Sequence, residues 1–201
     1  MNGVLSIAKN THEIKGDYRN VLDVLNDVFL GELKNERLRM SEIISLERSN
    51  VQAMIKKNEC DVEISTRMRS DFLVPKTFQI MSVMRNLLTN AAEAIGKGPG
   101  VITVTVSEEK DADDPYGAVR EYRIAVRDSG PGISKEAMND VFMEGYSTKF
   151  DSKTGNIQRG LGLSLVKDYI ENDFGGSISI ESEPGAFTEF RICIPADTMG
   201  R

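Results

Sequence analysis

Apolar positions in the first thirty residues recur at alternating steps of three and four. The series is Val4, Ile7, Thr11, Ile14, Tyr18, Val21, Leu25 and Val28, in which Thr11 is the one clearly hydrophilic member. This spacing predicts a helix with an a/d seam. Gly31 interrupts the series, and a second apolar-periodic stretch predicts another helix from about Glu36 to Lys57.

Two helices joined by a short turn form an antiparallel helical hairpin. A hairpin with two apolar faces buries too little surface to be stable alone in water. We therefore expect it to pair with a second copy, which gives a homodimer held by a four-helix bundle. The sequence predicts a hairpin domain at residues 1–59 and a second domain at residues 60–201.

The second domain shows both strand and helix patterns, and its loops hold most of the glycines. The predicted elements are a strand at 61–65, a helix at 76–95, strands at 101–106 and 119–127, short helices at 136–142 and 163–172, and strands at 177–183 and 187–194. This order favours an α+β fold with helices layered on one face of a mixed or antiparallel sheet.

Composition narrows the function classes. The net charge is −6, which argues against a long basic surface for nucleic acid. No apolar run approaches the length of a membrane span, so we expect a cytoplasmic chain whose membrane contact, if any, comes through segments outside it. Cys60, Cys193 and the single histidine, His12, cannot form a zinc site of His and Cys ligands.

Two segments of the second domain carry candidate binding chemistry. Asn86 and Asn90 lie four residues apart on one side of the predicted helix, and amide oxygens are suitable hard ligands for magnesium. Asp128 ends a predicted strand and is followed by Gly130 and Gly132, which let the backbone approach a ligand. Taken alone, the asparagines are more often solvent-facing residues, and Asp-x-Gly-x-Gly is more often a turn.

Two further segments suggest anion binding and a supporting contact. The glycine-rich helix start Arg159-Gly160-Leu161-Gly162 would present backbone N–H groups to phosphates. The preceding stretch, with Ser147, Thr148 and Lys149, suits a lid with phosphate contacts, although a surface loop is the simpler reading. Thr188 would hydrogen-bond through water toward Asp128.

His12 flanks the predicted helical seam beside Glu13. A partly exposed surface histidine is the ordinary interpretation from position alone. The alternative is a phosphoacceptor, because neutral imidazole is nucleophilic near pH 7 and a neighbouring carboxylate can accept its proton.

The ordered set of segments resembles the GHKL ATPase superfamily and, within it, the sensor histidine kinases. Five segments match its boxes: the N box at 86–94, the first glycine box at 128–132, the F box at Phe142 and 145–149, the second glycine box at 159–163 and a degenerate third at 185–188. His12-Glu13-Ile14-Lys15 resembles the H box of the phosphotransfer element.

The resemblance implies a Bergerat-type α/β sandwich that holds ATP and Mg²⁺ under a lid. Asp128 would bind the adenine amine, Asn90 with Asn86 the magnesium, and Lys149 with the Gly160–Gly162 backbone the phosphates. The γ-phosphoryl group would pass to His12, with Glu13 as base, and then to an aspartate on a response regulator receiver domain.

Three departures from the family pattern leave other functions open. Gly16 stands where many members have Thr or Asn, Phe187 replaces a glycine of the third glycine box, and the separation of His12 from Asn90 is short. The alternatives are a superfamily switch, interaction module or serine kinase that does not autophosphorylate on histidine, and a binding domain without nucleotide.

Overall fold

The computed structural model describes residues 37–114, 116–143, 145 and 162–199. Several predictions lie outside these residues. They concern the first helix of the hairpin with His12 and Glu13, and the lid and phosphate-loop residues Ser147, Thr148, Lys149, Arg159, Gly160 and Leu161. Residues 37–201 form one compact unit and residues 1–36 another.

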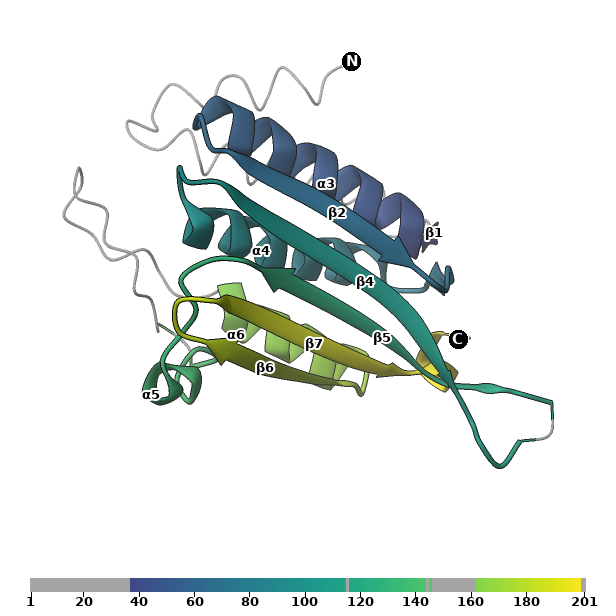
Figure 1. The fold of residues 1–201 in the computed structure, drawn as a ribbon. Coiled ribbons are helices and arrows are strands. Elements are labelled where there is room, and N and C mark those ends of the chain that lie inside the picture. Colours follow the sequence, from purple (N-terminus) through teal and green to yellow (C-terminus); the bar gives the residue numbers. More distant parts are fainter. Residues whose placement is uncertain (1–36, 115, 144, 146–161, 200–201) are drawn as a thin grey trace, which may run out of the picture. The chain divides into compact units, whose positions relative to one another are not determined.

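A mixed five-stranded sheet forms the centre of the described unit (Figure 1). Its strands are β2 (Val62–Met68), β4 (Gly100–Lys110), β5 (Val119–Asp128), β7 (Phe187–Pro195) and β6 (Ser177–Glu183), in that spatial order. β2 runs parallel to β4, and the other neighbours are antiparallel. The predicted strands are confirmed, and β2, β4 and β5 extend beyond their predicted ends.

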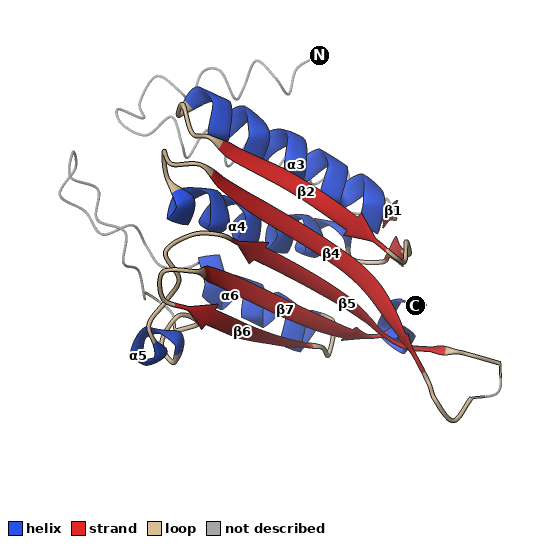
Figure 2. Cartoon of the chain, viewed as in Figure 1, coloured by secondary structure: helices blue, strands red, loops and turns tan. Residues whose placement is uncertain are grey.

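Helices cover one face of this sheet (Figure 2). They are α3 (Met40–Lys57), α4 (Thr77–Ile95) and α6 (Gly162–Asp168). The α6 helix continues as a π-helical turn, η2 (Tyr169–Asp173). Two short helices, α5 (Lys135–Met138) and α7 (Ala196–Met199), lie apart from them. Alternate residues of β4, β5 and β7 are buried, which is the pattern of a sheet with one covered face. The predicted layering is therefore present.

The α4 helix is the best-predicted element. Its buried side chains form a broad stripe that includes Ile80, Met84, Leu87 and Leu88. It ends at Gly96, whose φ of 72° lies in the left-handed region that glycine adopts without steric cost. The helix predicted at 136–142 is only the single turn of α5.

The α3 helix begins at Met40, not near Glu36, because Leu38–Arg39 form strand β1 against β3 (Leu73–Val74). Its buried apolar side chains are Met40, Ile43, Ile44, Val51 and Ile55. They are at most 6% exposed, and α3 packs against α4. α3 therefore belongs to the compact unit that begins at Arg37, although the sequence placed it in residues 1–59.

An ion pair with a buried carboxylate joins α3 to α4. Glu47 is fully buried and accepts two hydrogen bonds from the Arg85 guanidinium, Nε to Oε2 at 2.9 Å and Nη2 to Oε1 at 3.0 Å. The bidentate geometry satisfies both carboxylate oxygens at once. Arg85 directly precedes Asn86, so this pair fixes α4 beside a candidate site residue.

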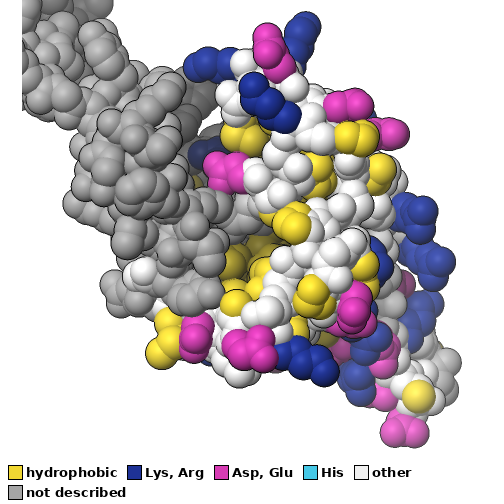
Figure 3. Space-filling view, turned by 60° about the vertical axis from the view of Figure 1, so that its left-hand side comes forward, with side chains coloured by type: hydrophobic (Ala, Val, Ile, Leu, Met, Phe, Trp, Pro, Cys, Tyr) yellow, Lys and Arg dark blue, Asp and Glu magenta, His cyan; other side chains and the backbone are white. Residues whose placement is uncertain are grey.

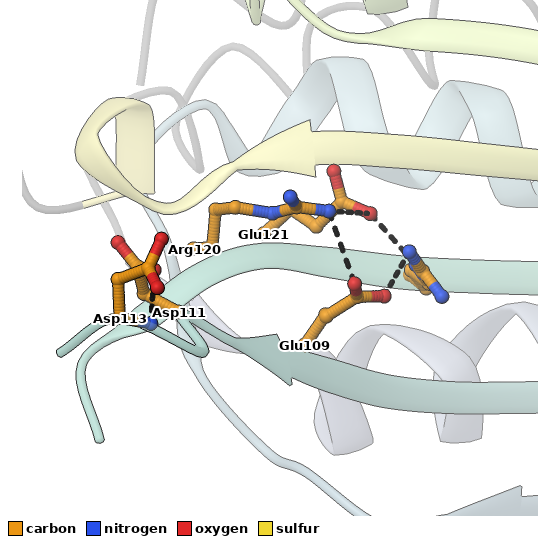
Figure 4. A network of polar contacts seen from close by, with 6 residues as sticks. Glu109, Asp111, Asp113, Arg120 and Glu121 are labelled. Carbon is orange, nitrogen blue, oxygen red and sulfur yellow. Dashed lines mark hydrogen bonds and ion pairs between the residues drawn. The ribbon is translucent and has the colours of Figure 1, made fainter. Parts of the chain in front are cut away.

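Charged side chains of opposite sign pair along the β4–β5 hairpin (Figure 4). Arg120 binds Glu109 at 3.0 Å, and Arg123 contacts both Glu109 and Glu121. Both signs are also interspersed on the face in Figure 3. Within the described ranges, no helix combines the length and hydrophobicity needed to cross a bilayer.

Arg85→Ala is expected to destabilise the domain by about 3 kcal/mol, because it leaves the Glu47 carboxylate buried without its partner. Urea denaturation of the variant and the wild type measures the difference. Replacing Glu47 by Leu in the same chain removes the unpaired charge and should recover most of the loss. Gln52→Ala, at an exposed position of α3, is the control. A loss for Arg85→Ala no larger than that of the control contradicts the assignment.

Candidate functional site

One stripe of α4 carries the two candidate amides. Asn86 donates from Nδ2 to the Ser82 carbonyl at 2.8 Å, so its Oδ1 is the acceptor atom of this side chain. That oxygen faces the start of α6, where a Cβ built on Gly162 would lie only 2.7 Å from it. Glycine at position 162 therefore lets α6 begin directly against the Asn86 oxygen.

The other end of this stripe meets the loop after β5. A Cβ built on Gly130 would lie 3.5 Å from the Ala94 backbone and 2.7 Å from the Asp128 Oδ1. Asn86, Asn90 and Ala94 are successive i, i+4 positions on one helix face. Since Asn86 meets α6 and Ala94 meets the Asp128 loop, Asn90 lies on the stripe between them. Three predicted segments therefore lie next to one another: the asparagine segment of α4, the glycine loop after Asp128 and the helix start at Gly162.

Asp128 is a buried carboxylate at the end of β5, only 4% exposed. Its Oδ1 accepts the Gly130 N–H at 2.8 Å, and the Thr188 N–H also donates to the carboxylate. Burial raises the pKa of Asp128, and the Gly130 N–H, the Arg127 charge and the Thr188 N–H oppose that rise. The site therefore holds an acceptor in a dry environment, where a hydrogen bond from a ligand is strong.

The β6–β7 turn packs against the same loop. The Gly185 N–H donates to the Pro131 carbonyl at 2.6 Å, and Gly132 has a φ of 70°. A Cβ on Gly132 would lie 2.2 Å from the Glu183 carbonyl oxygen, so only glycine fits there. The degenerate third glycine box at 185–188 is therefore in direct contact with the first glycine box at 128–132.

Phe187 does not disturb this arrangement. Its ring lies under the Arg127 guanidinium at 3.5 Å, and Arg127 is exposed. The next residue, Thr188, is 3% exposed and is the β7 partner of Asp128 in the sheet. Because consecutive strand residues point to opposite faces, Phe187 faces away from the site while Thr188 faces into it.

The site offers oxygen ligands of the kind that magnesium prefers. Within the described ranges, no group of three or more His, Cys, Asp and Glu side chains is gathered for a metal. The amide oxygen of Asn86, which faces the start of α6, suits an ion that shares its shell with phosphates and water. Sequence reasoning missed Ser82 and also Ser182, which contacts Thr188 and the loop end at Ile133.

The fold and the site define a class of nucleotide-binding sandwich domains, with a strand-end aspartate and an asparagine-bearing helix. The family model described as "Histidine kinase-, DNA gyrase B-, and HSP90-like ATPase" matches residues 76–198. The chain belongs to this family, and it corresponds to the catalytic portion of a GHKL histidine kinase.

Curated relatives are sensor histidine kinases. DcuS of Escherichia coli K12 is 40% identical over 119 residues, which are 59% of this chain and 19% of DcuS. GlnK of Bacillus subtilis is 24% identical over 180 residues, which are 90% of this chain and 41% of GlnK. The matched part of the chain therefore spans less than half the length of these relatives.

Solved structures share the fold. The nucleotide-free catalytic domain of histidine kinase ThkA has a TM-score of 0.62 and 25% identity, and the match covers 80% of this chain and 95% of that domain. The mycobacterial sensor histidine kinase MprB has a TM-score of 0.61 at 21% identity, covering 80% of this chain and 97% of that chain, which supports the fold alone.

Asp128→Asn is expected to change how stability depends on pH. A carboxyl whose folded pKa is raised binds its proton more readily in the folded state, so wild-type stability falls as pH rises from the ordinary aspartate value to the folded one. The asparagine variant lacks this titration. Its unfolding free energy relative to wild type should therefore increase over that window in denaturation series between about pH 4 and pH 7. A relative decrease would contradict the raised pKa.

Proposed function

We propose that this protein binds ATP with Mg²⁺ and is the kinase portion of a two-component system. The observation that carries the proposal is the meeting of three segments around the Asn90 stripe. Gly162 abuts Asn86, and Gly130 abuts Ala94 beside the buried Asp128 carboxylate. Family membership supports the same nucleotide.

Each site residue has a proposed role in holding the nucleotide. Asp128 accepts a hydrogen bond from the exocyclic amine of adenine. Asn90, with Asn86, supplies amide oxygens to magnesium. Ser147, Thr148 and Lys149 contact the phosphates, together with Arg159 and the backbone of Gly160–Gly162, where Leu161 separates the two glycines. Such binding supplies the positioning and charge neutralisation on which phosphoryl transfer depends.

The proposed acceptor is His12. In the first step its imidazole nitrogen bonds to the γ-phosphorus, the bond from that phosphorus to the bridging oxygen breaks, ADP leaves and Glu13 takes the imidazole proton. In the second step an aspartate oxygen of a receiver domain takes the phosphoryl group and the N–P bond breaks. His12 is the single histidine of the sequence, so a histidine acceptor within this chain or its homodimer has to be His12.

The homodimer is proposed to form through the N-terminal segment. The α3 helix belongs to the unit of residues 37–201, and the proposed dimer seam is formed by the periodic positions of residues 1–36. The short separation of His12 from Asn90 favours a second candidate function. An ATP-binding switch or interaction module, or a serine kinase of the superfamily, would need no histidine-bearing hairpin.

Incubation with γ-labelled ATP and magnesium is expected to give acid-labile label on the wild type. His12→Gln should abolish the label, because no other histidine can replace it. ATP affinity is measured on the same samples, since an unaffected affinity shows that the site is intact. Equal labelling of the variant would overturn the acceptor assignment. A folded wild type that binds ATP without label would favour the second function.

Asp128→Ala is expected to weaken ATP binding by about 10- to 100-fold, the effect of losing a hydrogen bond to a charged group. Titration calorimetry measures the change, and far-ultraviolet circular dichroism checks the fold. Asp140→Ala, an exposed aspartate beyond α5, is the matched control and should bind as wild type. Equal ATP affinities for Asp128→Ala and the control would contradict the proposed contact between Asp128 and the adenine amine.

A further inference from the structure

Ser182 connects three parts of the adenine end of the site. Its hydroxyl oxygen accepts the Ile133 N–H at 2.8 Å, donates to the Phe187 carbonyl at 2.7 Å and lies 3.2 Å from the Thr188 hydroxyl oxygen. Ser182 sits on β6 directly opposite Thr188 on β7. Asp128 is in turn the β5 partner of Thr188.

Hydrogen counting fixes the direction of the contact between the two hydroxyls. A serine hydroxyl has one hydrogen and two acceptor lone pairs. A carbonyl oxygen can only accept, so the Ser182 hydrogen goes to Phe187, and the Ile133 N–H occupies one lone pair. The remaining lone pair of Ser182 accepts from Thr188. The single hydroxyl hydrogen of Thr188 is thereby used, and its oxygen offers only lone pairs to a ligand.

Two side chains described at this end therefore present hydrogen-bond acceptors to the group that faces them. The Asp128 carboxylate accepts, and Thr188 beside it accepts as well. A base that faces this end has to supply N–H donors at the contacting position.

We propose that Ser182 is a positioning residue that makes the site selective for 6-aminopurine nucleotides, by holding the Thr188 hydroxyl as an acceptor. The inference rests on the proposed ATP function. The 6-amino group of adenine brings two N–H donors to the acceptors. The 6-oxo group of hypoxanthine places an acceptor against them and stays without a partner, which costs binding free energy in a buried site.

Ser182→Ala frees the Thr188 hydroxyl to turn and donate to a 6-oxo group. The experiment measures the affinities of the full chain for ATP and for inosine triphosphate, which carries the 6-oxo group on the same triphosphate. Wild type should prefer ATP. The variant should narrow the ratio of the two affinities by about fivefold, corresponding to about one hydrogen bond.

Matched variants separate selectivity from simple loss of packing. Ser182→Thr keeps the hydroxyl and should retain the wild-type ratio. Ser179→Ala, on an exposed position of the same strand, should leave both affinities unchanged. Thr188→Val removes the acceptor itself and should narrow the ratio as Ser182→Ala does, so it carries the test if Ser182→Ala fails to fold. The double variant should narrow the ratio no further than either single one.

The outcomes distinguish this inference from the proposed function. A folded wild type that binds neither nucleotide defeats the ATP function. A wild type that prefers ATP, with Ser182→Ala weakening both nucleotides equally, leaves the ATP function standing and overturns the role of Ser182. An unchanged ratio in Thr188→Val overturns it as well.

Discussion

Close approach of two glycines to one face of α4 is the constraint on which the site depends. At Gly162 and at Gly130 an added Cβ would meet Asn86 and the Asp128 carboxylate at 2.7 Å. These contacts bring the start of α6 and the end of β5 to opposite ends of the same helix face. A larger residue at position 162 would displace the Asn86 oxygen, and one at position 130 would displace the Asp128 carboxylate.

Much of the fold follows from short-range sequence patterns, since α4 has strong helical periodicity and the strands alternate regularly. The element that packs against α3 could not be predicted from such patterns. An amphipathic pattern shows that one helix face is buried, but it does not identify the residues that bury it. Its covering residues come from α4, and the ion pair from Glu47 to Arg85 spans 38 positions. The two-residue strands β1 and β3 are too short to produce a periodic signal.

The sequence predicted those site residues whose side-chain chemistry and position in an element indicate a ligand contact. Asp128 after a strand and two asparagines on one helix face are such cases. Ser182 carries no such signal, since serine is common on surfaces and in turns. Its role arises from partners distant in the sequence, because its hydroxyl accepts from Ile133, 49 positions away.

The connection to the N-terminal segment reaches the site through α4. The chain enters the domain at β1, where the Leu38 N–H donates to the Thr77 hydroxyl at 3.2 Å and the Met40 N–H to the Phe72 carbonyl at 2.9 Å. Thr77 is the first residue of α4, and Asn86 lies on the same helix. The entry point of the chain is therefore hydrogen-bonded to the first residue of the helix that carries the site amides.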